Sequence, residues 1–302
     1  MRSPSSLPDP YAGSSFRTSD AQARGVSRDR LRGSDLRSPH HGVRSPVPLL
    51  GVEQAAQDAL PVLPPAHAFS HVTAARLLGM PWPTQWDPEE PVHVVTPSGR
   101  FHLERPGLVS HRGLERRGTT VLSSGLTSTD DLHTWADAAA VLTVDQLIAA
   151  GDWVLRPRST RTLADLAGAL QRRMRGVRSA RLALLEIRPG SASPMETRTR
   201  LQLVRGGLPE PELNVTLSDE GGWLGVVDLF WRRWRLIAEY DGRHHVERQR
   251  TWERDVARER AFRDAGFGYE RLISGNVNGP APDAVAIVRR ALVRAGWRPG
   301  LT

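Results

Sequence analysis

Acidic side chains stand at the ends of two apolar stretches in the C-terminal third of the chain. Asp228 lies within the stretch from Trp223 to Trp231, and the next stretch ends on Glu239 and Asp241. Carboxylate oxygens of this kind bind Mg²⁺, which activates water and neutralises the charge that develops during phosphodiester hydrolysis. The residue types therefore indicate a metal-dependent hydrolytic site, provided that the fold brings the acids together.

The acids share one face only if the two stretches form a hairpin in a suitable register. A turn centred on the two arginines after Trp231 would place Asp228 opposite Ile237 and diagonal to Glu239, about 7–8 Å away. Asp241, two residues further along, would lie on the same face. A turn longer by one residue would move the second pair of acids to the opposite face. In the favourable register, we expect the carboxyl groups to converge on one cation.

Histidine and a further glutamate supply the other groups that such a site needs. Imidazole exchanges protons near neutral pH, and His244 and His245 are the only histidines after residue 133. Glu196 already fits a capping box, with Ser193 as the N-cap of a helix that begins at Pro194. Each acid also has an ordinary interpretation as a solvated strand end or an arginine partner. Spacing alone leaves both interpretations open.

Composition indicates an anionic partner and excludes several chemistries. The formal net charge is +8, and all 41 basic residues are arginine, so a lysine Schiff base or a P-loop lysine is impossible. Arginine binds phosphate through a planar fork, and a basic balance favours nucleic acid as partner. A GC-rich genome would produce the same bias without any function. The chain contains no cysteine, which excludes disulfides and thiolate metal sites.

The first two thirds of the chain show weaker patterns. Residues 1–20 are predicted to be a disordered basic tail. Residues 21–190 are predicted to be a mostly helical N-terminal α+β region that is antitoxin-like or contacts DNA. Within it, Ser70 and Gly79 bound a clear helix. His67 and His71 are four residues apart, but Ser70 leaves His67 outside that helix and no third ligand stands nearby, so no metal is expected there.

The last third predicts a sheet covered by helices. Between residues 191 and 298 the expected order is helix, three strands, helix, strand and helix, with a long basic helix from about Arg250 to Ala265. A strand–helix–strand crossover after a meander implies a mixed sheet. The predicted fold class is thus α/β (α+β), with a domain at 191–298 that follows a smaller region and that the resemblance described next identifies as nuclease-like.

These residues resemble a known family. The segments "SPMETRTRLQLVRGGLPEPELNV", "VVDLFWRRWRLIAEYDGRHH" and "RDVARERAFRDAGFGYERL" resemble the very-short-patch-repair-type endonuclease domain of the restriction-endonuclease-like PD-(D/E)xK group. The resemblance covers about residues 190–295 and implies an αβββαβ core with a metal-dependent nuclease site. The positions that match the family's motifs are Asp228, Glu239, Asp241 (in place of the usual lysine), His245, Glu196, and Asp255 with Arg258.

The chain departs from the general pattern because it has no lysine to fill the motif. Very-short-patch-repair enzymes also lack that lysine and use histidine, which keeps activity possible through His245. Their structural zinc site requires cysteines and is absent here. The region 20–160, through "FSHVTAARLLGMP", is similar to the part labelled AbiEi-antitoxin-like in related proteins, which suggests a toxin or a restriction or repair system as a possible partner.

The sequence therefore predicts a cytoplasmic endonuclease that nicks or cuts DNA with Mg²⁺ or Mn²⁺. Asp228 and Glu239 would hold the metal, and Asp241, His245 and Glu196 would complete the catalytic group. The phosphate contacts expected on the basis of charge and position are Arg243, Arg248, Arg254 and Arg258. The alternative is an inactive nuclease fold that binds DNA as a regulator or antitoxin-like protein. No signal peptide or membrane span of about 20 apolar residues is recognisable.

Overall fold

A computed structural model describes residues 6–99, 103–219, 222–242 and 250–300, and residues 250–255 are described by their backbone alone. In these residues, no helix has the length and apolar character needed to cross a membrane. The chain divides into two compact units. One consists of Met1–Leu142 with Gly168–Val177, and the other of Thr143–Ala167 with Arg178–Thr302.

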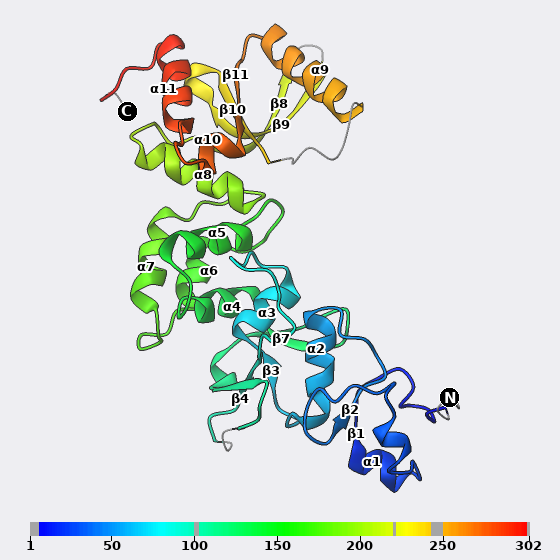
Figure 1. Ribbon diagram of the computed structural model, residues 1–302. Coiled ribbons are helices and arrows are strands. Elements are labelled where there is room, and N and C mark those ends of the chain that lie inside the picture. The colour runs from blue at the N-terminus through cyan, green and yellow to red at the C-terminus, as the bar shows by residue number, and fades with distance from the viewer. Residues whose placement is uncertain (1–5, 100–102, 220–221, 243–249, 301–302) are drawn as a thin grey trace. The chain divides into compact units, whose positions relative to one another are not determined.

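A five-stranded mixed sheet forms the centre of the first unit (Figure 1). Its strand order is β5-β4-β3-β7-β6, and the β4/β5 and β3/β7 pairs are parallel. Phe69, Val94 and Leu126 form its buried core with two alanines of α2. The elements are α2 (Val52–Ala59), β3 (Ala68–Phe69), α3 (His71–Leu78), β4 (Val92–Thr96), β5 (Leu108–Arg112), β6 (Thr119–Val121), β7 (Thr127–Thr129) and α4 (Asp131–Ala138).

Helix α3 begins and ends where the sequence predicts. Ser70 is its N-cap residue, and Gly79 ends it in the left-handed conformation with a φ of 73°, which glycine adopts at little cost. The expectation that the first region is the smaller one is not met, because the two compact units are of comparable size. A mixed sheet organises the first of them.

The expected disorder of residues 1–20 is also corrected for the residues that the structure describes. Residues 6–20 include β1 (Phe16–Arg17) and the start of α1 (Thr18–Ala23), and β1 pairs with β2 (Val43–Arg44). Tyr11 and Phe16 are buried with their ring centroids 4.7 Å apart. Two aromatic side chains in a Ser- and Pro-rich segment are enough to anchor it to the small cluster around Leu31.

The second unit contains a four-stranded mixed sheet with the order β11-β10-β9-β8. β10 and β11 are parallel, and the other pairs are antiparallel. The predicted order of helix, three strands, helix, strand and helix is confirmed, with one short helix added after β11. The elements are α8 (Pro194–Arg205), β8 (Glu212–Asp219), β9 (Gly222–Trp231), β10 (Leu236–Asp241), α9 (Arg250–Asp264), β11 (Gly268–Ile273), α10 (Ser274–Asn278) and α11 (Ala284–Arg294).

Helices cover both faces of this sheet (Figure 1). On one face, Leu229, Trp231 and Leu272 pack against residues of α8 and α11. On the other, Phe230 and Ile237 pack against Phe262 of α9. Gly225 has a φ of 155°, and a Cβ at this position would lie 3.2 Å from the Phe262 ring. Glycine therefore lets α9 approach β9 closely.

The second unit begins earlier than the expected boundary at residue 191. It includes α5 (Val144–Val154), α6 (Leu163–Gly168) up to Ala167, and nearly all of α7 (Val177–Glu186). The physical reason is a buried ion pair, because Asp152 of α5 accepts hydrogen bonds from Arg200 at 3.0 Å and from Thr197 at 2.8 Å, both on α8. Such a pair must stay together to remain hydrogen-bonded.

Candidate functional site

The hairpin of β9 and β10 differs in register from the expectation by two residues. Ile237 lies opposite Phe230 and Ala238 opposite Leu229. The difference arises because a short 3₁₀ turn, Arg232–Trp234, is followed by Arg235 in the left-handed conformation. A shift of two residues preserves the side-chain face, and continuation of this register would set Glu239 directly opposite Asp228.

Asp228 lies beside an unusual backbone conformation in β8. The register places Leu213 opposite Leu229 and Val215 opposite Val227, and Asn214 between them has a φ of 48°. The Oδ2 atom of Asp228 accepts the backbone N–H of Tyr240 at 3.0 Å. The side chain of Asp228 thus links β9 to the C-terminal end of β10.

The carboxyl group of Asp228 has a strongly raised pKa. Burial raises it first, and the negative charges of Glu196 and Glu239 add to the effect, whereas the Tyr240 N–H and Arg258 oppose it. The result is a pKa of about 7 against an ordinary value of 3.8. An acid in this condition has too little positive charge around it, which is typical of a functional site.

Glu239 is held by two donors from the α9 side of the sheet. Its Oε1 accepts a hydrogen bond from Arg258 at 2.5 Å, and its Oε2 accepts one from the Tyr269 hydroxyl. Arg258 also donates to the carbonyl of Val226. The guanidinium of Arg258 therefore lies at the acidic pocket, and its expected contact with phosphate stays a prediction.

The other two acids have partners as well. Asp241 lies 3.4 Å from Arg271 of β11. Glu196 is 8% exposed, and its Oε2 accepts hydrogen bonds from the Asn214 side chain at 2.7 Å and from the Ala192 N–H at 2.8 Å. Ser193 caps the helix through the Glu196 N–H as predicted. Glu196 acts on Asp228 through its charge, within a well-ordered cap.

Asp228, Glu239 and Asp241, but not Glu196, line a cavity of about 450 Å³ beside strands β9, β10 and β11. The expectation that three carboxyl groups converge on one cation is not met. Within the described residues, the acidic side chains do not form a group of three whose ligand atoms are close enough to share a metal ion. The side chains that do form such a group are three histidines. The residues that line the cavity are Ser193, Met195, Val226, Asp228, Glu239, Tyr240, Asp241, Gly242, Arg258, Tyr269 and Arg271.

Several expected site residues lie outside the described residues. His245, Arg243 and Arg248 fall in the segment 243–249, and Arg254 and Asp255 fall where only the backbone of α9 is described. Their predicted roles as proton carrier and phosphate contacts stay predictions.

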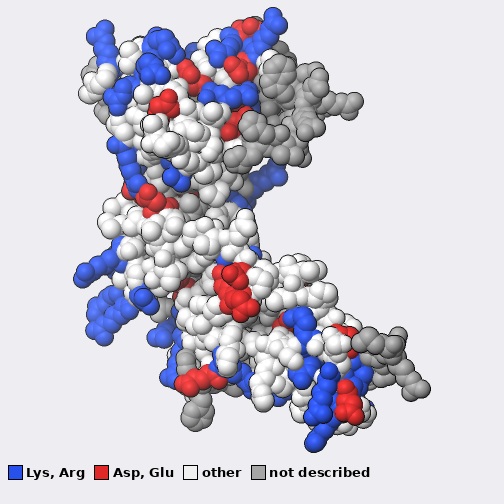
Figure 2. Space-filling view, in the orientation of Figure 1, with Lys and Arg blue, Asp and Glu red and all other residues white. Residues whose placement is uncertain are grey.

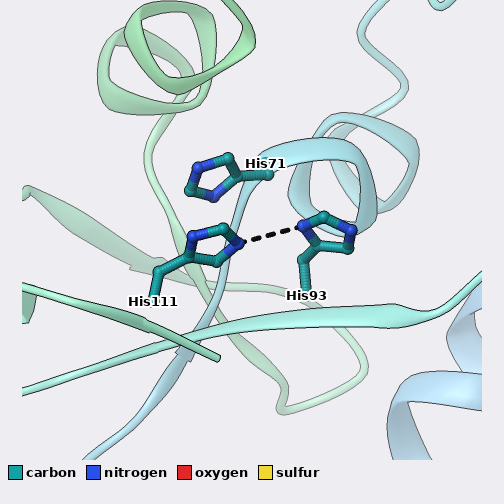
Figure 3. Close-up of side chains that lie close together, drawn as sticks. All are labelled: His71, His93 and His111. Atoms are coloured by element: carbon teal, nitrogen blue, oxygen red, sulfur yellow. Dashed lines mark hydrogen bonds between the residues drawn. The ribbon is translucent and has the colours of Figure 1, made fainter. Parts of the chain in front are cut away.

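The sequence interpretation missed a histidine cluster in the first unit. His71, His93 and His111 come from α3, β4 and β5, and their possible ligand atoms all lie within 4.8 Å of one another (Figure 3). His93 Nδ1 and His111 Nε2 are 3.0 Å apart, and the rings of His71 and His111 stack with centroids 3.5 Å apart. The available signal was one histidine in each of the two strand-like segments "PVHVVT" and "LVSHR".

Burial keeps the three imidazoles neutral. Together with the smaller effect of the neighbouring histidines, it lowers the pKa of His71 and of His111 to about 3. The pKa of His93 is lowered mainly by burial. Three half-buried neutral imidazoles on separate elements are uncommon as plain packing groups, since each keeps a polar nitrogen to be satisfied.

A second cavity, of about 310 Å³, adjoins this cluster through His71. It also includes Asp137, whose Oδ1 is held by Arg117 at 2.7 Å. Its remaining polar lining is mainly positive, and the arginines are Arg112, Arg116, Arg117, Arg173 and Arg175.

The structure defines a mixed α/β protein of two units, with an acidic pocket in one and a histidine cluster in the other. Comparison with known proteins shows that the chain belongs to the family that includes the uncharacterized proteins Rv2248 and MT2308 of two Mycobacterium tuberculosis strains. Each is 32% identical to this chain over 244 residues, which cover 78% of the chain and 86% of the relative. No family model matches the chain, and no solved structure matches it significantly.

Proposed function

We propose that the second unit is a Mg²⁺- or Mn²⁺-dependent DNA endonuclease of the restriction-endonuclease-like type. One observation carries the proposal: Asp228 shares a cavity with Glu239 and Asp241, and its charge is poorly compensated. A hard divalent cation beside Asp228 would supply the missing positive charge. The αβββαβ order of the elements around the cavity supports the same interpretation.

The fit of a cation differs between the two expected ligands. Among the described residues, the Tyr240 N–H is the hydrogen-bond donor to Asp228, which leaves carboxylate lone pairs for a metal. Both oxygens of Glu239 already accept a hydrogen bond. Glu239 would therefore bind with its remaining lone pairs or after Arg258 turns away.

When bound, Mg²⁺ polarises the scissile phosphate and lowers the pKa of a water ligand. The protein side chains supply the other parts of the reaction. Arg258 and Arg271 line the cavity and can bind phosphate oxygens in place of the acids. Glu196 keeps the field around Asp228 negative, which favours cation binding. His245 is proposed to carry the proton.

The test is relaxation of supercoiled plasmid by the full chain with Mg²⁺ or Mn²⁺. We expect nicking that requires the metal and falls at least about 100-fold in Asp228→Asn, because removal of a metal-ligand charge abolishes the site. Glu212→Gln is the matched control, since Glu212 is an exposed acid of β8 that pairs with Arg232 outside the cavity. Equal activity in Asp228→Asn and wild type would contradict the proposal.

A DNA-binding protein without cleavage is the second candidate. The observation that favours it is the pairing of Glu239 with Arg258 and of Asp241 with Arg271, which neutralises acids that a nuclease needs. On the face drawn in Figure 2, arginines spread over the surface with acidic side chains among them. This regulator would be favoured if the protein does not nick DNA and if its affinity for DNA changes neither with Mg²⁺ nor in Asp228→Asn.

Salt dependence separates both candidates from a chain whose arginines reflect composition alone. Phosphate contacts release counterions, so the affinity for DNA must fall steeply as salt rises. An affinity for DNA that does not change with ionic strength would contradict both DNA-based functions.

A further inference from the structure

We propose that His71, His93 and His111 form a binding site for one transition-metal ion of the Zn²⁺ class in the first unit. This site is independent of the acidic pocket and of the proposed nuclease activity. Imidazole nitrogen is a borderline ligand that suits Zn²⁺, Co²⁺ and Ni²⁺, whereas Mg²⁺ prefers oxygen.

The spacing of the nitrogens fits a shared ion. The possible ligand atoms of the three side chains all lie within 4.8 Å of one another, and His93 Nδ1 and His111 Nε2 are 3.0 Å apart. Two imidazoles on one tetrahedral Zn²⁺ ion have nitrogens roughly 3.3 Å apart, given Zn–N bonds of about 2.0–2.1 Å. A small movement of the His93 and His111 side chains away from each other would therefore make room for the ion between their nitrogens.

The strands fix two of the ligands. β4 and β5 are parallel neighbours, with His93 beside Val109 and His111 beside Val95. The two histidines thus stand two positions apart on the same face. The His93 N–H donates to the Thr73 hydroxyl of α3 at 2.8 Å, which ties the strand to the helix that carries the third ligand.

The third ligand is held in an unusual backbone conformation. His71 is the first residue of α3 and has a φ of 52°, in the left-handed region that is unfavourable for a residue other than glycine. Strain of this kind is found where a side chain must be aimed at a functional position. Here it directs the imidazole toward the histidines of the two strands (Figure 3).

Neighbouring groups assign the two nitrogens of His71. Its Nδ1 is 3.1 Å from the Ser70 hydroxyl and 3.7 Å from Asp137 Oδ2. A carboxylate beside one nitrogen orients a metal-binding histidine and leaves the other nitrogen for the metal. The ring stacks on His111 at an interplanar angle of 13°, so metal binding requires His71 to rotate until Nε2 points at the ion. Asp137 stays in place during this rotation because Arg117 holds it.

Three histidine ligands leave a fourth coordination position open, as in hydrolytic zinc sites. His71 lines the arginine-rich cavity described above. The fourth position is therefore reached from a positively charged space, which suits water, hydroxide or an oxyanion.

Titration of the chelator-treated full chain with Co²⁺ tests the site, because four-coordinate Co²⁺ on histidine absorbs visible light strongly. We expect one Co²⁺ per chain with intense visible bands, loss of the bands when Zn²⁺ is added, and no bands in His93→Asn or His111→Asn. His71→Gln changes a residue at a helix terminus and serves if a strand variant does not fold, as judged by circular dichroism.

Two control variants separate this site from other metal-binding groups. His41→Asn changes an exposed histidine of the same unit, and Asp228→Asn changes the acidic pocket. Both variants should keep the intense bands and the one Co²⁺ ion per chain that produces them. Absence of the bands in the wild type, or bands of full intensity in His111→Asn, would overturn the proposal. Its failure would leave the plasmid-nicking result unaffected, so the two proposals fail separately.

Discussion

Replacement of Asp228 by asparagine should stabilise the metal-free protein at alkaline pH. Asparagine is nearly isosteric with a protonated aspartate, and its carbonyl oxygen can accept the Tyr240 N–H as Asp228 does at 3.0 Å. The variant therefore resembles the form of Asp228 that the pocket favours, and it removes the charge that burial and Glu196 oppose.

The magnitude follows from the raised pKa. In the unfolded chain Asp228 loses its proton near 3.8, and in the folded protein it keeps the proton to about 7. Between these values the folded state binds more protons, so the free energy of unfolding of the wild type falls as pH rises. The full difference corresponds to about 4 kcal/mol, and water entering the open cavity reduces it, so we expect a gain of about 2–4 kcal/mol at pH 8.

Urea unfolding, read by pulsed hydrogen exchange of peptides from β9 and β10, measures this free energy in the second unit alone. At pH 4 the variant and the wild type should be about equally stable, and the gain should appear between pH 4 and pH 7. Asp241→Asn is the matched control, because Asp241 pairs with Arg271 and its replacement should bring no gain. An Asp228→Asn protein that is no more stable than wild type at pH 8 would refute the electrostatic reasoning.

Three further substitutions test other parts of the second unit by the same unfolding assay. Glu239→Gln should destabilise the unit by about 1–3 kcal/mol, since a charged hydrogen bond to Arg258 is lost, and an unchanged stability would show that the pair is not formed. Arg200→Met should cost about 3–5 kcal/mol, because it leaves Asp152 buried and unpaired, and a neutral effect would contradict the assigned ion pair. Gly225→Ala should lower the free energy of unfolding by about 1–3 kcal/mol, because Gly225 has a φ of 155° and lies close to α9. A variant that is more stable than the wild type would show that α9 moves to accommodate the new methyl group.

Local sequence signals predicted the elements of the second unit well. Ser193, Pro194 and Gly206 bound α8 as expected, and the apolar stretches up to Trp231 and Asp241 are the expected strands. These features depend on residues near one another in the chain, so spacing and capping rules are sufficient to find them.

Features that depend on contacts between residues far apart in the chain could not be predicted from the sequence. The hairpin register depends on whether Arg235 adopts the left-handed conformation, and nothing in its neighbours signals this. The partners of Glu239, which are Arg258 and Tyr269, come from a helix and a strand that follow it in the chain. The unit boundary likewise depends on Asp152 and Arg200, 48 residues apart.

The histidine cluster shows the same limit in the first unit. His93 and His111 lie close together because β4 and β5 are parallel neighbours. The residue pattern of a strand does not tell which other strand it pairs with. The spacing of His67 and His71 drew attention to a helix, although His67 instead contacts the Pro64 carbonyl at 2.7 Å. A metal-ligand search by sequence spacing fails when each ligand comes from a different element.

The most direct test of the central claim, that the pocket around Asp228 binds a hard divalent cation, is Mn²⁺ binding measured by electron paramagnetic resonance at pH 8. The wild type should bind Mn²⁺ in this pocket, Asp228→Asn should lose that binding, and both Glu212→Gln and His111→Asn should retain it. Equal uptake of Mn²⁺ by wild type and Asp228→Asn, or none by either, would contradict the account.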